Sequence, residues 1–104
     1  MRASKESILK YLKDIKSELN TKGIVRVGLF GSYAKGEETI YSDIDIAIMK
    51  DAQFLSKNSS YVYFDIVSDI KEKVRKKFHK NIDIFDLDSQ SSFKNSIEKE
   101  LIYV

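Results

Sequence analysis

Two aspartates one residue apart are the side chains in this sequence best suited to metal chemistry. Asp43 and Asp45 belong to the segment 43–48, in which polar and apolar residues alternate as in a strand with one buried face. A period of two places both carboxylates on one face of that strand, roughly 7 Å apart. Two such carboxylates repel unless water or a cation lies between them, and magnesium is usually held by one or two carboxylates plus substrate phosphates. The pair therefore predicts a site for a divalent cation.

A glycine and a serine stand at a fixed interval before the aspartates. Gly31 and Ser32 follow the apolar run Ile24–Phe30, and ten residues separate them from Asp43. We expect the run to be a buried strand, and Gly31 to let the backbone turn sharply and approach a ligand. Ser32 is a good N-cap for a short helix through Lys35, whose first turn offers free N–H groups to phosphate. The segment predicts a phosphate site beside a metal site.

A third carboxylate is expected on the strand predicted for residues 81–87. In the sequence Asn-Ile-Asp-Ile-Phe-Asp-Leu, Asp83 faces away from the isoleucines on either side of it. An aspartate within an apolar strand is costly unless it is paired or bound to metal, so we prefer Asp83 as the third carboxylate. Two rivals stay open: Asp86, which faces the opposite way in a regular strand, and Asp88, near the strand end.

Apolar residues at helical spacing predict two long helices. The first begins at a Ser4 cap and ends near Lys22, before Gly23, and the second begins at Ser59 or Ser60. The residues expected to be buried are Ile8, Leu12, Ile15 and Leu19 in the first helix and Tyr63, Val67, Ile70, Val74 and Phe78 in the second.

The C-terminal part predicts one more helix and a short edge strand at residues 102–104. Ser89 or Ser91 can cap the helix. Its apolar residues, one turn apart, are Phe93, Ile97 and Leu101. The order helix, strand, short helix, strand, helix, strand, helix predicts an α/β (α+β) fold, a small mixed β-sheet with helices packed on one side.

Several other features have a plain structural interpretation. The basic run at residues 71–80 could bind phosphate or RNA, but it is also typical of solvated positions at a helix C-terminus, which is the interpretation we prefer. His79 is the only histidine and is expected at the helix end. Phe54 and Leu55 are expected to pack inward from a loop. Tyr33 could stack on a nucleotide, although ordinary packing is the better interpretation.

Composition restricts the class of protein. The 104 residues are typical of one domain, residues 1–104, and 42% hydrophobic with 33% charged residues is typical of a soluble globular protein. A net charge of +2 offers no bulk electrostatic case for direct nucleic-acid binding. The lack of cysteine excludes disulfides and thiolate metal sites. We expect no signal peptide and no membrane segment, and therefore a cytoplasmic location.

Gly-Ser, ten residues, Asp-x-Asp and then a strand aspartate together resemble the signature of the DNA polymerase beta-like nucleotidyltransferase superfamily. The whole chain is similar to its smallest branch, the minimal nucleotidyltransferases, over nearly all 104 residues. The full signature in its strand context is fairly specific, whereas either half alone would be weak. The resemblance implies the polymerase beta-like nucleotidyltransferase fold and Mg-dependent transfer of AMP from ATP to a hydroxyl group.

The resemblance also implies a role for each site residue. Asp43 and Asp45 would hold two magnesium ions, about 3.5–4 Å apart as in other two-metal sites. Asp83 would hold only the ion that activates the acceptor hydroxyl, and could receive its proton. The phosphate contacts would come from Gly31, Ser32 and Lys35.

Lys35 departs from the pattern of many relatives, which have arginine at its position. Lysine keeps the positive charge but loses the two-pronged geometry of a guanidinium group. A contact with the β- and γ-phosphates of ATP would therefore survive in a weaker form.

Minimal nucleotidyltransferases are typically paired with a small helical HEPN protein. The resemblance implies an antitoxin that transfers AMP to a tyrosine of a HEPN RNase toxin, in a hetero-oligomer or as a homo-oligomer. Two alternatives stay open. The chain could be a binding module that neutralises its partner by occlusion without catalysis, or a nucleotidyltransferase for small molecules or RNA ends with a separate substrate-binding subunit.

Overall fold

Four strands form one mixed sheet in the computed structural model, which describes residues 2–89 and 92–104. Their spatial order is β3-β2-β1-β4, with bounds β1 Ile24–Phe30, β2 Ile44–Lys50, β3 Ile82–Asp86 and β4 Ile102–Tyr103. β1 is antiparallel to both β2 and β4, whereas β2 and β3 are parallel. The predicted strands, including the short C-terminal one, are confirmed. Because β2 and β3 are parallel neighbours, residues at their N-terminal ends meet at the same edge of the sheet.

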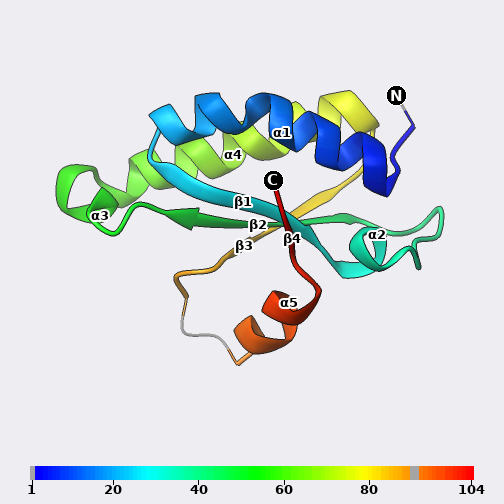
Figure 1. Ribbon diagram of the computed structural model, residues 1–104. Coiled ribbons are helices and arrows are strands. Elements are labelled where there is room, and N and C mark those ends of the chain that lie inside the picture. The colour runs from blue at the N-terminus through cyan, green and yellow to red at the C-terminus, as the bar shows by residue number, and fades with distance from the viewer. Residues whose placement is uncertain (1, 90–91) are drawn as a thin grey trace.

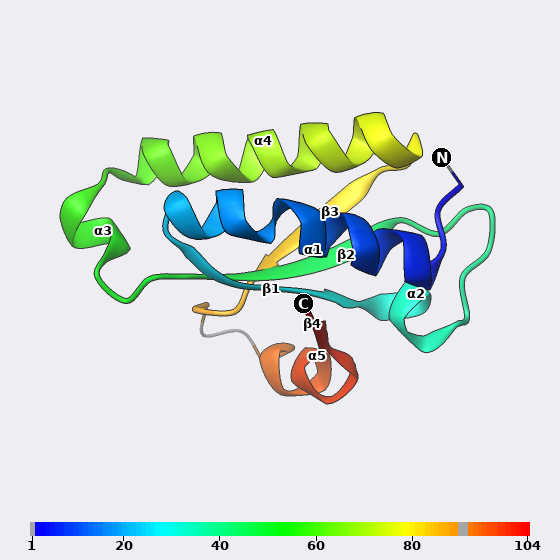
Figure 2. The ribbon, with the colours of Figure 1, turned by 45° about the horizontal axis from the view of Figure 1, so that its top comes forward.

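Two long helices cover one face of the sheet, α1 (Lys5–Thr21) and α4 (Ser60–Phe78). Figure 2 shows them lying side by side above the strands. The predicted serine caps are confirmed, since Ser4 accepts a hydrogen bond from the Ser7 N–H and Ser59 accepts one from the Val62 N–H. Their buried residues are Ile8, Leu12, Ile15 and Leu19 in α1 and Ile66, Ile70, Val74 and Phe78 in α4.

The burial of α4 differs slightly from the predicted stripe. Ile66 is buried at the core, while Tyr63 and Val67 pack against it only in part. The apolar face of an amphipathic helix is wider than one line of residues at three- and four-residue spacing. Residues on either side of the predicted stripe therefore also contact the sheet.

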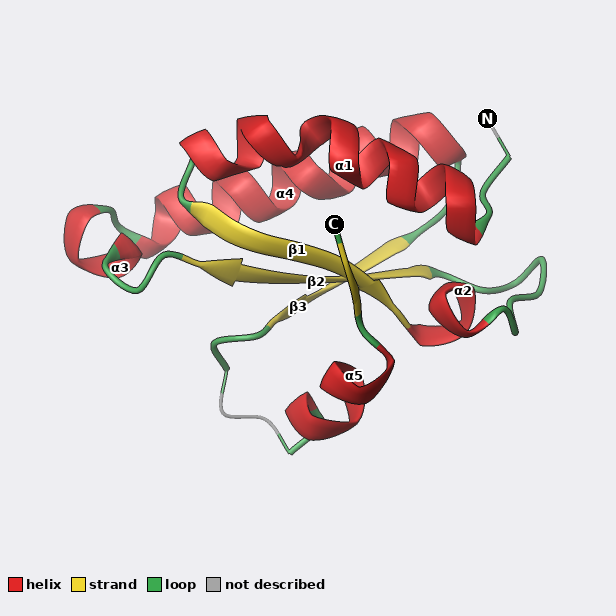
Figure 3. Cartoon of the chain, in the orientation of Figure 1, coloured by secondary structure: helices red, strands yellow, loops and turns green. Residues whose placement is uncertain are grey.

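The short helix α5 (Lys94–Glu100) lies on the opposite face of the sheet from α1 and α4, as Figures 1 and 3 show. There Ile97 packs with Ala47 and Leu87 in a second, smaller apolar cluster. α1 and α4 thus pack on one side as predicted, whereas α5, which was expected on that side too, lies on the other face, because apolar strand residues there also need to be covered.

The start of α5 differs from the sequence prediction. Phe93 stands at its N-cap position without a side-chain hydrogen bond, and its side chain is 69% exposed instead of buried. Ser89 therefore does not cap this helix, and Ser91 lies outside the described residues. The helix begins later than its apolar spacing indicated, so Phe93 precedes the face that packs on the sheet.

The connection between β2 and α4 contains the short helix α3 (Phe54–Lys57). Phe54 is buried as predicted, but Leu55 is 55% exposed, so the prediction that Leu55 packs inward is wrong. Adjacent helix positions point about 100° apart, and only one of the two can face the core. Within the described part of the chain, no helix is long and apolar enough to span a membrane.

Candidate active site

Asp45 and Asp83 lie at paired positions of the two parallel strands. Asp45 is the second residue of β2, Asp83 is the second residue of β3, and the two are partners in the parallel register. Asp43 directly precedes β2 and is exposed. The neighbouring isoleucines Ile44 and Ile82 are buried with α1 and α4. Since side chains alternate along a strand, the three aspartates share the face that the long helices leave open.

The grouping of these carboxylates has an electrostatic consequence for Asp45. Burial, and after it the negative charges of Asp83, Asp43 and Glu100, together raise the pKa of Asp45 to about 6. Like charges disfavour the ionised form of a carboxyl group, whereas a nearby cation favours it. Binding of a cation by this cluster would therefore be electrostatically favourable.

Gly31 closes the site from the end of β1, where the helix α2 (Gly31–Lys35) begins. Its φ of +75° lies in the left-handed region, which favours glycine. A Cβ at this position would also collide with the Asp45 carboxylate oxygen Oδ2. Glycine is thus needed here for two reasons: the backbone conformation, and the close approach of the Asp45 side chain.

The start of α2 corrects the prediction that Ser32 is its N-cap. The N-cap position belongs to Phe30, which has no side-chain hydrogen bond to the helix, and Ser32 is the second residue within it. The positive φ of Gly31 turns the chain directly from strand into helix, one residue earlier than the serine indicated. Tyr33 is 2% exposed, so ordinary packing, the preferred interpretation, is confirmed.

Lys35 reaches toward the same turn from the last residue of α2. Its Nζ lies 3.5 Å from Glu100 Oε2 and 3.8 Å from Glu37 Oε2. The Gly31 N–H donates a 3.0 Å hydrogen bond to the other Glu100 oxygen, Oε1. The sequence indicates no role for Glu100, because a single glutamate at the end of a short helix belongs to no motif. Only the packing of α5 against α2 brings it to the site.

The rival carboxylates Asp86 and Asp88 belong to a separate network at the other end of the strands. Asp86 accepts hydrogen bonds from Lys50 Nζ at 2.8 Å and from the Tyr63 hydroxyl at 2.9 Å. Asp88 accepts from the backbone and the ammonium group of Lys50. Burial acts to raise the pKa of Asp86, but its hydrogen bonds, that from Lys50 first among them, lower it overall. These two carboxylates are satisfied by protein partners. Within the described residues, by contrast, the Asp83 side chain makes no hydrogen bond or ion pair.

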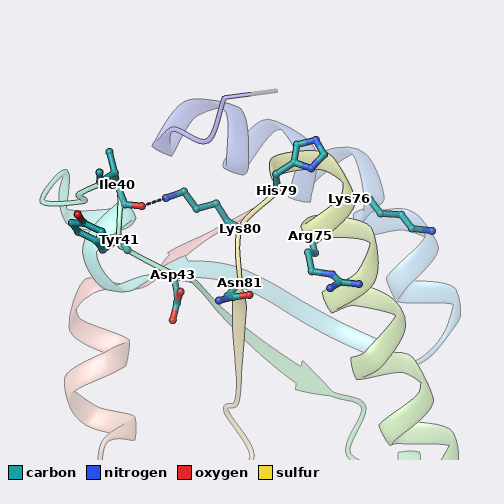
Figure 4. A pocket seen from close by; sticks show the side chains of 9 residues that line it. Ile40, Tyr41, Asp43, Arg75, Lys76, His79, Lys80 and Asn81 are labelled. Atoms are coloured by element: carbon teal, nitrogen blue, oxygen red, sulfur yellow. Dashed lines mark hydrogen bonds between the residues drawn. The ribbon is translucent and has the colours of Figure 1, made fainter.

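A hollow of about 590 Å³ opens beside Asp43, between the loop before β2 and the C-terminal end of α4. Figure 4 shows Tyr41, Arg75, Lys76 and Lys80 around it. A second hollow of about 530 Å³ is lined by both Asp43 and Asp83 together with Lys71 and Arg75. The basic run of α4 thus lies next to the carboxylates, a proximity that the sequence did not reveal.

His79 ends α4 as expected, in the left-handed region with a φ of 57°. Its N–H donates to the Arg75 carbonyl, which closes the last turn of the helix. This structural role confirms the interpretation of His79 as a helix-end residue.

The donor set suits a hard divalent cation, since it consists of carboxylate oxygens that repel one another without one. In the described residues, no three His, Cys, Asp or Glu side chains are drawn together closely enough to hold an ion as they stand. The three aspartates suit magnesium because they offer oxygen ligands on the same face of the sheet. Their side chains would have to move closer together to bind the ion.

Comparison with known proteins agrees with this geometry. A family model described as "Polymerase beta, Nucleotidyltransferase" matches residues 13–104. A protein of Methanocaldococcus jannaschii, named a putative protein adenylyltransferase, is 35% identical over 102 residues, which cover 96% of this chain and 93% of that protein.

Two solved structures share the fold. The structure of a putative minimal nucleotidyltransferase has a TM-score of 0.70 and 20% identity, covering 96% of this chain and 95% of the other. A toxin–antitoxin structure with AMP-PNP has a TM-score of 0.62 and 22% identity, covering 97% of this chain and 72% of the other. At these identities the likeness establishes the fold alone.

Proposed function

The chain belongs to the polymerase beta nucleotidyltransferase family, and on that premise we propose that it transfers AMP from ATP to a hydroxyl group of a protein. That it is a nucleotidyltransferase follows from the family and from its relative in Methanocaldococcus jannaschii. That relative is named a putative protein adenylyltransferase, which supports a protein as the acceptor. The observation that carries the proposal is the pairing of Asp45 with Asp83 beside the Gly31 turn.

Asp43, Asp45 and Asp83 would hold two magnesium ions, with Asp83 on the ion at the acceptor side. Bound magnesium would neutralise charge on the phosphates and lower the pKa of the acceptor hydroxyl. The backbone N–H of Gly31, the Ser32 hydroxyl and Lys35 would bind the β- and γ-phosphates and so fix the α-phosphate in position. Positioning and charge complementarity of this kind supply most of the rate in phosphoryl-type transfers.

In the transfer step, Asp83 accepts the proton and the other site residues hold the nucleotide in place. The hydroxyl oxygen of the acceptor forms a bond to the α-phosphorus of ATP. The bond from that phosphorus to the oxygen bridging to the β-phosphate breaks, and pyrophosphate leaves with the electron pair. Asp83 takes the hydroxyl proton and later releases it to water.

The acceptor would enter from the side of α4, because the hollow lined by both Asp43 and Asp83 opens there. Lys71 and Arg75 would contact the acceptor protein around its hydroxyl group. We propose a tyrosine of a HEPN-type RNase toxin as that acceptor, which makes this chain the antitoxin of the pair and places it in the cytoplasm, where ATP is available.

Label transfer tests the proposal. The purified chain is incubated with Mg²⁺ and ATP labelled at the α-phosphate, with and without a lysate of its native host. We expect a labelled protein band that disappears with Asp43→Ala and persists with Asp65→Ala, an exposed aspartate of α4 outside the site. A labelled RNA or small molecule would contradict the protein acceptor. Absence of any label, with folded protein that still binds its partner, would favour neutralisation by occlusion.

A further inference from the structure

Glu100 holds both groups to which the proposed function assigns the phosphates of ATP. The Gly31 N–H donates to Glu100 Oε1 at 3.0 Å, and Lys35 Nζ lies 3.5 Å from Glu100 Oε2. One carboxylate thus bridges a backbone donor and an ammonium group with one oxygen on each. Two oxygens of a phosphate group would make the same pair of contacts, since charge-assisted hydrogen bonds to carboxylate and to phosphate use the same donors.

The position of Glu100 adds negative charge where negative charge is already concentrated. Glu100 is among the groups that raise the pKa of Asp45, after Asp83 and Asp43. An anion beside three aspartates is unfavourable in itself, so the contacts with Gly31 and Lys35 have to offset repulsion. A triphosphate accompanied by magnesium brings compensating positive charge, which the Glu100 side chain does not.

Glu100 can leave this position without moving its helix. α5 is anchored through Ile97, which is buried against Ala47 and Leu87, and through β4, which pairs with β1 directly after it. The Glu100 side chain itself is 28% exposed and is the last residue of α5. Rotation about its side-chain bonds is therefore enough to free the Gly31 N–H and Lys35.

We propose that Glu100 is an internal competitor of the triphosphate, which occupies the phosphate site of the nucleotide-free protein and is displaced when Mg-ATP binds. This inference rests on the proposed function, because it concerns the same site. The apparent affinity for nucleotide is reduced by the fraction of molecules in which Glu100 blocks the site. Lys35 exchanges one anionic partner for another during binding, so its charge is never left without a partner.

Two other roles for Glu100 make opposite predictions. If Glu100 joined the aspartates in holding metal, removal of its charge would weaken nucleotide binding. If it only tethered the C-terminal segment to β1, a glutamine would keep an oxygen acceptor for the Gly31 N–H and change nothing.

The test measures binding of the α,β-methylene analogue of ATP, which cannot transfer AMP, by isothermal titration calorimetry with Mg²⁺ present. The variants are Glu100→Gln and, as a matched control, Glu98→Gln, an exposed glutamate of the same helix. We expect Glu100→Gln to lower the Kd about five- to tenfold, the difference between a charge-assisted and a neutral hydrogen bond, and Glu98→Gln to leave it unchanged. Glu100→Ala provides the same test if circular dichroism shows that the glutamine variant is unfolded.

Each outcome decides the matter. A lower Kd for the Glu100 variant alone supports competition, as does binding by that variant when the native chain shows none. An equal or higher Kd overturns the inference while leaving the proposed function intact. Failure of the native chain and both variants to bind the analogue overturns the proposed function together with the inference.

Discussion

Asp45 of β2 and Asp83 of β3 are direct partners in a parallel pair of strands, on the sheet face that the two long helices leave open. The strands that carry them are separated in sequence by α3 and α4. Parallel strands require such a crossover connection, and the crossover brings the two N-terminal ends to one edge of the sheet. A site built this way has rigid walls, because each aspartate projects from a hydrogen-bonded strand and not from a loop.

Asp83 and Asp86 lie three residues apart on β3, and their substitution should have opposite consequences. Asp83→Asn should lower AMP transfer by at least about 100-fold, because a charged group at the acceptor is lost, with little change in stability. Asp86→Asn weakens the contacts with Lys50 and Tyr63 and should lower the free energy of unfolding by about 1–2 kcal/mol. Urea unfolding and label transfer on both variants check this. If the folded Asp86 variant lost AMP transfer and the Asp83 variant retained it, Asp86 and not Asp83 would be the third carboxylate of the site.

Gly31 and Gly36 form a matched pair for a test of the close approach to Asp45. Both have left-handed φ, +75° and +71°, so alanine at either position should cost about 1–2 kcal/mol of stability. An added Cβ meets the Asp45 carboxylate at Gly31, and nothing within 4 Å at Gly36. We therefore expect Gly31→Ala to abolish binding of Mg-ATP and Gly36→Ala to retain it, as measured by calorimetry. Equal binding by the two variants would show that Mg-ATP binding does not depend on the position of the Asp45 side chain.

Asp45 should make the metal-free protein less stable as the pH rises. Its folded-state pKa of about 6 lies above the ordinary value of 3.8, so the folded protein retains a proton that the unfolded chain releases. The stability due to the protonated group is complete below about pH 4 and is lost as the pH rises through about 6. Asn at this position cannot ionise. Asp45→Asn should therefore be more stable than the native chain by about 1–2 kcal/mol at pH 7.5, a value reduced for solvent screening.

Urea unfolding at two pH values, with EDTA present, measures this effect. The advantage of Asp45→Asn should shrink toward zero at about pH 3, below the ordinary pKa of 3.8, where the native aspartate is mostly protonated in both states. The same advantage at both pH values would mean that packing, and not ionisation, is responsible. Added Mg²⁺ should stabilise the native chain at pH 7.5 more than the variant, because ligand binding to the folded state raises its stability.

Arg75 should act on the acceptor and not on the nucleotide. It lines both hollows beside Asp43 and lies on α4, away from the Gly31 turn. Arg75→Ala should raise the KM for the acceptor protein about threefold or more while the Kd of Mg-ATP stays the same. Lys10→Ala, an exposed cation of α1, is the control for a general loss of positive charge. A change in the nucleotide Kd alone would place the nucleotide, and not the acceptor, on the α4 side.

Much of this fold and site could be predicted because the deciding information is local. The strand Ile24–Phe30 is a continuous apolar run, and Ser4 and Ser59 are caps that act on their own first turns. The common face of Asp43 and Asp45 follows from strand alternation alone. Each of these predictions depends on residues within one or two turns of chain, where backbone geometry and residue type leave few alternatives.

Tertiary structure decided the rest, because it depends on what each element packs against. Asp83 and Asp86 are both strand aspartates, and only the pairing with β2 and the contacts of α4 separate the open position from the hydrogen-bonded one. Glu100 has no sequence pattern at all and reaches Gly31 only because α5 packs on the face opposite α4. The amino-acid sequence by itself determined the local elements and the acidic residues and glycine turn of the proposed site. The contacts among distant segments determined which carboxylates remain open, because a strand aspartate is either hydrogen-bonded or without a protein partner according to its neighbours.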